Sequence, residues 1–181
     1  MDQVKRIKRE LAYQGNVLNV YCDTMETPDG DTVKYDYIHH NGAAAVVPVT
    51  EDGKILMVHQ FRNALDRITV EIPAGKLDFA GESGRDCAAR ELEEETGYRS
   101  DDLELLITLR TTVALCNEKI EIYVARNLIS SRQNLDADEY IDVKAYTVAE
   151  LKDMIFEQKL EDSKTIAAIL AYEAKYLSSM S

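Results

Sequence analysis

Three glutamates in one short stretch of the chain are the residues best suited to chemistry. Glu91, Glu94 and Glu95 lie within two turns of a predicted helix. Because an α-helix turns by about 100° per residue, their side chains fall within an arc of about 100° around the helix axis. Glu91 and Glu95 are like charges one turn apart, a pairing that lowers helix stability. A hard cation such as Mg²⁺ reverses that cost, because it binds carboxylate oxygens together with substrate phosphates. The spacing therefore indicates a metal site for a phosphate-containing substrate.

The alternative interpretation is a solvated acidic face, which is the usual role of a glutamate-rich run on a helix. The flanking residues argue against it. Ala88 and Leu92 lie on the adjoining arc, so the acidic stripe borders a buried face. Ser83 is placed to cap the start of the helix with Asp86 as its capping-box partner, and Gly97 is placed just past its end. A short helix bounded in this way is a scaffold for carboxylates.

The stretch that contains these glutamates resembles the Nudix box, G-x5-E-x7-R-E-U-x-E-E-x-G-U, in which U is a bulky apolar residue. In one departure from the pattern, six residues separate Gly75 from Glu82 in place of five. The extra residue falls in a loop, where an insertion costs little. The positions that match in register are Glu82, Arg90, Glu91, Leu92, Glu94, Glu95, Gly97 and Tyr98.

The resemblance implies a metal-dependent hydrolase that cleaves a nucleoside diphosphate linked to another group. It implies Glu91 and Glu95 as the main metal ligands, and Glu94 as a catalytic residue that is a third or water-mediated ligand. The backbone carbonyl of Ala74 is a further expected ligand. The expected ion is Mg²⁺, with Mn²⁺ as a substitute, because metal ions supply most of the electrostatic stabilisation in pyrophosphate hydrolysis.

Four other residues of the box are expected to support it structurally. Arg90 and Glu82 are expected to form an ion pair that fixes the loop against the helix, because residues behind the ligands orient them. Gly75 and Gly97 complete this supporting set.

A general base and a phosphate-binding cation are also implied. Glu118, on the loop that follows a predicted strand, is the first candidate for the base, and Glu139 is the second; for Glu118 the alternative is a solvated loop glutamate. Arg62 ends an apolar strand and is predicted to contact substrate phosphates, since guanidinium suits bidentate phosphate binding. The alternative there is a surface arginine. His59 is assigned no role.

Bulk properties exclude several classes of function. The 181 residues suffice for one domain with a full core, and the net charge of −12 argues against nucleic-acid binding, which needs basic patches. Three scattered cysteines predict reduced thiols and a cytoplasmic protein. We expect neither a signal peptide nor a membrane span.

The order of predicted elements favours an α+β protein. The Nudix resemblance specifies an α/β/α sandwich with a mixed central sheet and a small N-terminal antiparallel sheet. Residues 1–40 are expected to form that sheet, which swaps between the subunits of a homodimer, and residues 41–181 the Nudix hydrolase domain. Strands are predicted over Asn16–Cys22 and Glu104–Val113 among others, and Thr27–Asp31 is a predicted turn between two strands. Helices are predicted in the box and over Val148–Gln158 and Asp162–Leu177, with Thr147 and Asp162 as caps.

Segments outside the box resemble those of the ADP-ribose pyrophosphatase branch. This resemblance implies a small nucleotide substrate, ADP-ribose, which is cleaved to AMP and ribose 5-phosphate. Two departures leave the substrate open: Thr112–Ala114 replaces a Ser-Pro-Gly turn, and Tyr35 replaces an arginine. The alternatives are another sugar nucleotide such as GDP-mannose, or a non-catalytic module that senses a nucleotide. The segments similar to this branch are 42–49, 59–62, 71–75 and 161–165.

Overall fold

A computed structural model describes residues 3–15, 18–79, 81–135, 137 and 139–178. The chain divides into two compact units. The first contains Met1–Asn41 together with Arg110–Lys119, and the second contains Gly42–Leu109 and Ile120–Ser181. None of the helices in the described ranges is long and apolar enough to cross a membrane.

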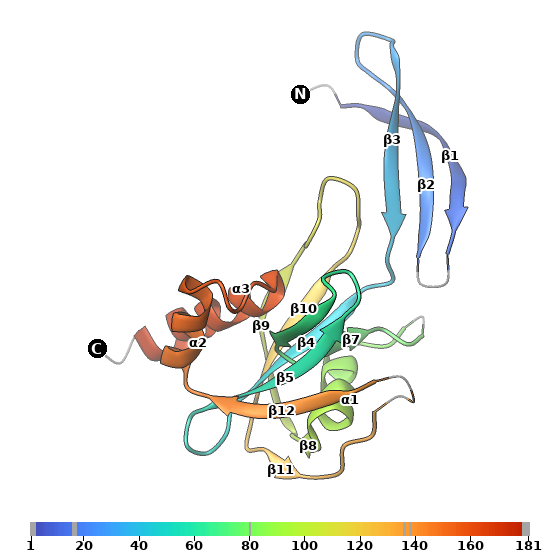
Figure 1. Cartoon of the computed structure of the whole chain (residues 1–181). Coiled ribbons are helices and arrows are strands. Elements are labelled where there is room, and N and C mark those ends of the chain that lie inside the picture. Colours follow the sequence, from blue (N-terminus) through green and yellow to red (C-terminus); the bar gives the residue numbers. More distant parts are fainter. Residues whose placement is uncertain (1–2, 16–17, 80, 136, 138, 179–181) are drawn as a thin grey trace. The chain divides into compact units, whose positions relative to one another are not determined.

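The first unit is built on a three-stranded antiparallel sheet in the order β1-β2-β3 (Figure 1). Its strands are β1 (Lys5–Gln14), β2 (Asn19–Glu26) and β3 (Thr32–His39). The predicted turn between the last two strands is confirmed, because the Thr27 amide donates to the Asp31 carbonyl at 2.9 Å. Part of the run predicted to start at Asn16 lies outside the described residues.

The segment Arg110–Lys119 joins this sheet through backbone hydrogen bonds to the end of β3. The amide of Ile38 donates to the Leu115 carbonyl at 2.7 Å, and the amide of Asn117 donates to the Ile38 carbonyl at 3.4 Å. Strand β9 therefore ends at Leu109, four residues before the predicted end at Val113, because the chain leaves the second unit there.

The second unit has two larger sheets. One has the order β7-β4-β10-β9, with β4 and β10 parallel and the other pairs antiparallel, and the other is antiparallel in the order β12-β5-β6. A short pair, β11-β8, is its third sheet. The strands are β4 (Ala43–Pro48), β5 (Ile55–Arg62), β6 (Arg67–Glu71), β7 (Ala74–Lys76), β8 (Tyr98–Arg99), β9 (Asp102–Leu109), β10 (Ile120–Arg126), β11 (Ile129–Ser130) and β12 (Ile141–Tyr146).

The helices of this unit are α1 (Gly84–Thr96), α2 (Val148–Phe156) and α3 (Ser163–Tyr172), and a π-helical turn, η1 (Glu173–Leu177), follows α3. The two C-terminal helices begin at their predicted caps. Thr147 accepts a hydrogen bond from the Glu150 amide in a full capping box, and Asp162 accepts from the Thr165 amide. Because η1 interrupts it, the predicted helix to Leu177 is α-helical only as far as Tyr172.

Strand β4 explains where the core lies. Its apolar residues are buried on both faces, which is the pattern of a strand inside a layered α/β structure. Ala44 and Val46 pack with Leu92 of α1, whereas Ala45 and Val47 belong to the larger cluster that includes residues of β5, α2 and α3. Helix α1 is thus held on one face of the mixed sheet, which confirms the predicted α+β sandwich (Figure 1).

Candidate active site

Helix α1 carries the three glutamates, and local sequence sets its ends. Ser83 accepts a hydrogen bond from the Asp86 amide at 3.1 Å, as predicted, and its hydroxyl donates to the Asp86 carboxylate at 2.7 Å. Gly97 has φ 71°, the left-handed conformation that ends helices, and its amide donates to the Glu93 carbonyl. The glutamates therefore lie at fixed positions on a helix with both ends defined.

Two of these glutamates are buried against the chain that leaves β6 and forms β7. The exposed fractions of Glu91 and Glu95 are 9% and 3%, while Glu94 is half-buried. The Ala74 amide donates to Glu95 Oε2 at 3.0 Å. A Cβ atom at Gly75 would stand 1.8 Å from Glu91 Oε1, so only glycine leaves room for this carboxylate. The predicted residues Ala74, Gly75, Glu91 and Glu95 thus meet at one place.

Burial perturbs the ionisation of both carboxylates. Desolvation, reinforced by the negative charge of Glu91, raises the pKa of Glu95 to about 8. Desolvation also raises the pKa of Glu91 to about 7, although the neighbouring Arg90 charge works in the opposite direction. Because the two carboxylates are buried, close together and resist ionisation, the binding of a positive charge beside them is strongly favoured.

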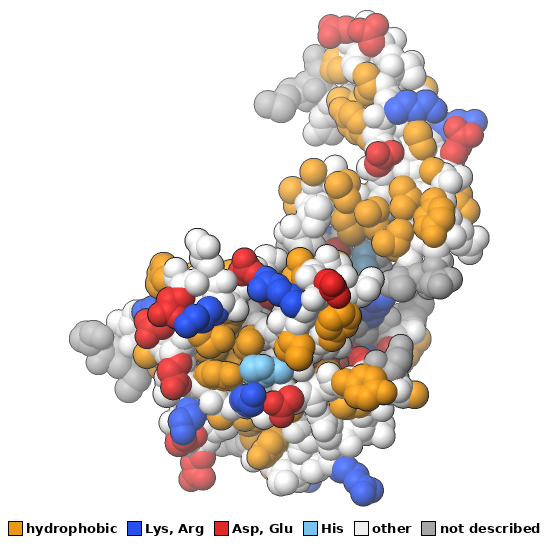
Figure 2. Space-filling model, viewed as in Figure 1, with side chains coloured by type: hydrophobic (Ala, Val, Ile, Leu, Met, Phe, Trp, Pro, Cys, Tyr) orange, Lys and Arg blue, Asp and Glu red, His pale blue; other side chains and the backbone are white. Residues whose placement is uncertain are grey.

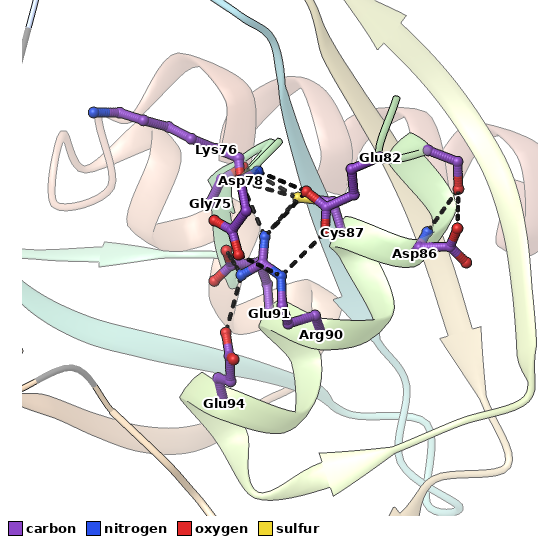
Figure 3. Close-up of polar contacts among 10 residues, drawn as sticks. Gly75, Lys76, Asp78, Glu82, Asp86, Cys87, Arg90, Glu91 and Glu94 are labelled. Carbon is purple, nitrogen blue, oxygen red and sulfur yellow. Dashed lines mark hydrogen bonds and ion pairs between the residues drawn. The ribbon is translucent and has the colours of Figure 1, made fainter. Parts of the chain in front are cut away.

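Arg90 supplies positive charge at this site and connects the loop to the helix (Figure 3). Its Nε donates to Glu82 Oε1 at 3.1 Å, which is the predicted ion pair, and Glu82 in turn accepts from the Asp78 amide at 2.7 Å. Its Nη1 also donates to Glu91 at 2.6 Å and to Glu94 at 3.0 Å. The sequence had indicated only the first of these contacts.

The donor set fits a hard divalent cation. Glu91 and Glu95 offer buried carboxylate oxygens, which are the ligands that Mg²⁺ prefers, and the absence of a side chain at Gly75 leaves the space that the Glu91 carboxylate occupies. Within the described residues no three His, Cys, Asp or Glu side chains converge on one point, and the cation that faces Glu91 and Glu94 is the Arg90 guanidinium. The carbonyl of Ala74 as a ligand stays a prediction.

Arg62, the predicted phosphate contact, is held by an acidic residue that the sequence analysis had not singled out. Its Nε and Nη2 donate to the two oxygens of Glu71, at 2.7 and 2.6 Å. The positive charge of Arg62 also acts on Glu95, where it lowers the pKa. Glu71 lies in the segment 71–75 that resembles the ADP-ribose pyrophosphatase branch, and this resemblance is the sequence signal that could have identified it.

The first candidate for the general base belongs to the other unit. Glu118 accepts a hydrogen bond from the Thr111 hydroxyl, and its Oε1 lies 3.4 Å from His40 Nε2. Asn117 fixes the same loop, because its side chain accepts from the His40 amide at 2.7 Å and donates to the His40 carbonyl at 3.0 Å. Glu118 is thus oriented by its own unit, and its role as a base stays a prediction.

The second candidate, Glu139, acts electrostatically on Glu91 and Glu95. Its negative charge contributes to the raised pKa values of Glu91 and Glu95. Its neighbours Asp136 and Asp138 lie outside the described residues. His59, given no role, stacks on Tyr146 and lies 2.9 Å from its hydroxyl, and burial lowers its pKa.

Comparison with known proteins decides the family. The model of the NUDIX domain matches residues 39–169, which is most of the chain. The chain belongs to the Nudix family. It is 37% identical to the ADP-ribose pyrophosphatase of Bacillus subtilis over 173 residues, which covers 94% of this chain and 93% of the relative. This similarity confirms the predicted branch and the assignment of the chain as a Nudix hydrolase.

Two further similarities extend this result. The Nudix chain is 43% identical to the methanol dehydrogenase activator of Bacillus methanolicus over 168 residues, covering 91% of this chain and 90% of the relative. Its fold matches a crystal structure of an ADP compounds hydrolase with a TM-score of 0.89 and 20% identity, covering 99% of this chain and 97% of the other. The second likeness supports the Nudix fold alone.

Proposed function

We propose that this Nudix hydrolase cleaves the pyrophosphate bond of a nucleoside diphosphate sugar in a Mg²⁺-dependent reaction, and that its substrate is ADP-ribose, which yields AMP and ribose 5-phosphate. The observation that carries the proposal is the buried pair Glu91 and Glu95 beside Gly75, with raised pKa values that a divalent cation would lower. The similarity to an ADP-ribose pyrophosphatase supports the choice of substrate. Mn²⁺ is expected to substitute for Mg²⁺.

In the proposed reaction each residue has a separate task. A bound divalent cation would neutralise charge that develops on the phosphoryl oxygens during attack by water. Glu91 and Glu95 would hold that cation, with Glu94 as a third or water-mediated ligand. Arg62 would donate its remaining N–H groups to the phosphates, since Glu71 occupies only two of five donors. Glu118 would take the proton from the attacking water, with Glu139 as the alternative base.

The decisive experiment is a substrate panel with product identification. Purified protein in Mg²⁺ should convert ADP-ribose to AMP and ribose 5-phosphate, and EDTA should stop the reaction. The Glu95→Gln variant is the matched control because it keeps side-chain size and loses the ligand charge. The proposal fails if no sugar nucleotide in the panel is hydrolysed. Faster turnover of GDP-mannose would keep the reaction and replace the substrate.

We also propose that the protein is a cytoplasmic homodimer in which residues 1–40 swap between subunits. Figure 2 shows hydrophobic side chains on the surface of the first unit, and Ile7, Leu11, Tyr13 and Tyr35 are more than half exposed there. Surface of this kind is typical of sites that bind another protein. Light scattering should give the mass of two chains, and removal of residues 1–40 should give monomers. A monomeric full-length chain would contradict the swap.

A second function is favoured by the 43% identity to a methanol dehydrogenase activator. The chain would then act on a partner enzyme, either through hydrolysis or as a module that only senses a nucleotide. Adding wild-type and Glu95→Gln protein to a methanol dehydrogenase assay separates these cases. Activation by both would indicate sensing without hydrolysis, whereas activation by wild type alone would require catalysis. No activation by either would remove this second function.

A further inference from the structure

A network of four charged side chains, two of them buried, joins the end of β6 to the start of α3. Glu71 is 3% exposed and Lys164 is 8% exposed, and each is paired. Lys164 Nζ donates to Glu71 Oε2 and, at 2.9 Å, to Asp162. Arg62 completes the set through its two hydrogen bonds to Glu71. Two positive and two negative charges therefore balance, which compensates the buried charges of Glu71 and Lys164.

The position of Lys164 is fixed independently of Arg62. Asp162 is the N-cap of α3 and accepts from the Thr165 amide at 3.0 Å and its hydroxyl at 2.6 Å. The Thr165 oxygen accepts in turn from the Ile72 amide at 3.0 Å. This ties the first turn of α3 to the residue after Glu71. Lys164 therefore reaches the carboxylate from a rigid helix terminus, whereas the Arg62 side chain is part-exposed.

Glu71 shares its charge between these two cations. Oε1 accepts from Arg62 and from Thr69 at 2.7 Å, and Oε2 accepts from Arg62 and from Lys164. If Arg62 were the only cation, moving its guanidinium toward a phosphate would leave a buried carboxylate without compensation, which is strongly unfavourable. With Lys164 in place, the negative charge of Glu71 stays paired when Arg62 directs some of its N–H donors toward a substrate.

We propose that Lys164 is a positioning residue for Arg62, acting through Glu71 to leave the guanidinium oriented yet available to a phosphate group. The inference rests on the proposed function, because Arg62 is the phosphate contact there. Lys164 touches no substrate in this scheme. Lys164 sets how strongly Arg62 can interact with the pyrophosphate group. Loss of Lys164 should therefore weaken ligand binding more than it slows the chemical step.

A double-mutant cycle on ligand binding tests this coupling. Binding of ADP-ribose, and separately of inorganic pyrophosphate, is measured by calorimetry in EDTA, where no turnover occurs. Lys164→Met should weaken binding about tenfold, the size expected for a hydrogen bond to a charged group. The same substitution in a Glu71→Gln background should change affinity less than threefold, because the carboxylate that competes for Arg62 is gone.

The control Lys152→Met removes another lysine–glutamate pair, with Glu173 at 2.6 Å, and should leave affinity unchanged. Lys164→Gln serves if Lys164→Met does not fold, since it keeps hydrogen bonding and removes the charge.

In Mg²⁺, KM should rise while kcat changes less than threefold. Equal losses of affinity in the presence and absence of Glu71, or a lower kcat at unchanged KM, would overturn the proposal. If the wild type binds pyrophosphate but not ADP-ribose, the substrate is wrong and the cycle remains valid with pyrophosphate. Binding of neither ligand would overturn the inference with its premise.

Discussion

The carboxylate of Glu91 occupies the space that a side chain at position 75 would need, because a Cβ there would stand 1.8 Å from Oε1. A glycine in β7 and a glutamate in α1 are therefore matched in shape, 16 positions apart in the sequence. This match brings a buried carboxylate against the backbone of β7, next to the residue whose amide binds Glu95.

Gly75→Ala should therefore displace Glu91 and damage the proposed metal site. We expect a loss of stability of about 1–3 kcal/mol from overpacking, together with a fall in kcat/KM of about 10–100-fold. Chemical denaturation and turnover of ADP-ribose in Mg²⁺ measure the two effects. Adding Glu91→Asp, which shortens the side chain by one carbon, should recover stability without recovering activity. Full activity in Gly75→Ala would show that the close approach is unimportant.

Glu95→Gln should stabilise the metal-free protein at alkaline pH. The pKa of Glu95 is raised from 4.5 to about 8, so the folded state keeps a proton that the unfolded state loses. Wild-type stability therefore falls as pH rises from 4.5 to 8, by up to a few kcal/mol at about 1.4 kcal/mol per pKa unit, and the variant escapes this loss. Thermal melts in EDTA at pH 5 and pH 8 measure the difference.

The same variant should lose the stabilisation that metal gives. Adding Mg²⁺ at pH 8 should raise the melting temperature of the wild type and leave that of Glu95→Gln nearly unchanged, because a ligand that binds only the folded state stabilises it. An equal shift in both proteins would place the metal away from Glu95.

Glu71 should make the protein sensitive to acid. Burial alone would raise its pKa, but the Arg62 hydrogen bonds and the Lys164 charge outweigh burial and lower the pKa to about 2. The stabilisation is therefore complete above pH 4.5 and is lost as pH falls toward 2, to an extent of about 3 kcal/mol. Urea unfolding between pH 6 and pH 3 should show a shallower dependence in Glu71→Gln. Identical slopes would mean that other carboxylates dominate.

Glu118→Gln and Glu139→Gln should separate the two candidate bases. Loss of a general base costs about 10²–10⁴ in rate, so the substitution that removes the base should lower kcat by that factor at nearly unchanged KM. We expect this result for Glu118→Gln and a change below tenfold for Glu139→Gln. The reverse pattern would transfer the role to Glu139, whose charge already acts on Glu91 and Glu95.

Local features of the fold could be predicted well. The caps Ser83, Thr147 and Asp162 and the terminator Gly97 lie where the sequence placed them, because capping depends on a few adjacent residues. Boundaries that depend on distant partners were missed. Strand β9 ends before Val113 because residues 110–119 pair with β3, and nothing within the strand itself signals that change.

The sequence by itself determined the family, the α+β sandwich and the helix that presents Glu91, Glu94 and Glu95, because the box has fixed spacing and a helix converts spacing into direction. Only the tertiary structure decided which of these carboxylates are buried, how Arg90 divides its charge among them, and that Glu71 is shared by Arg62 and Lys164. Burial and pairing arise where segments distant in the chain meet, and the resulting desolvation and Coulomb energies cannot be assigned from residue order alone.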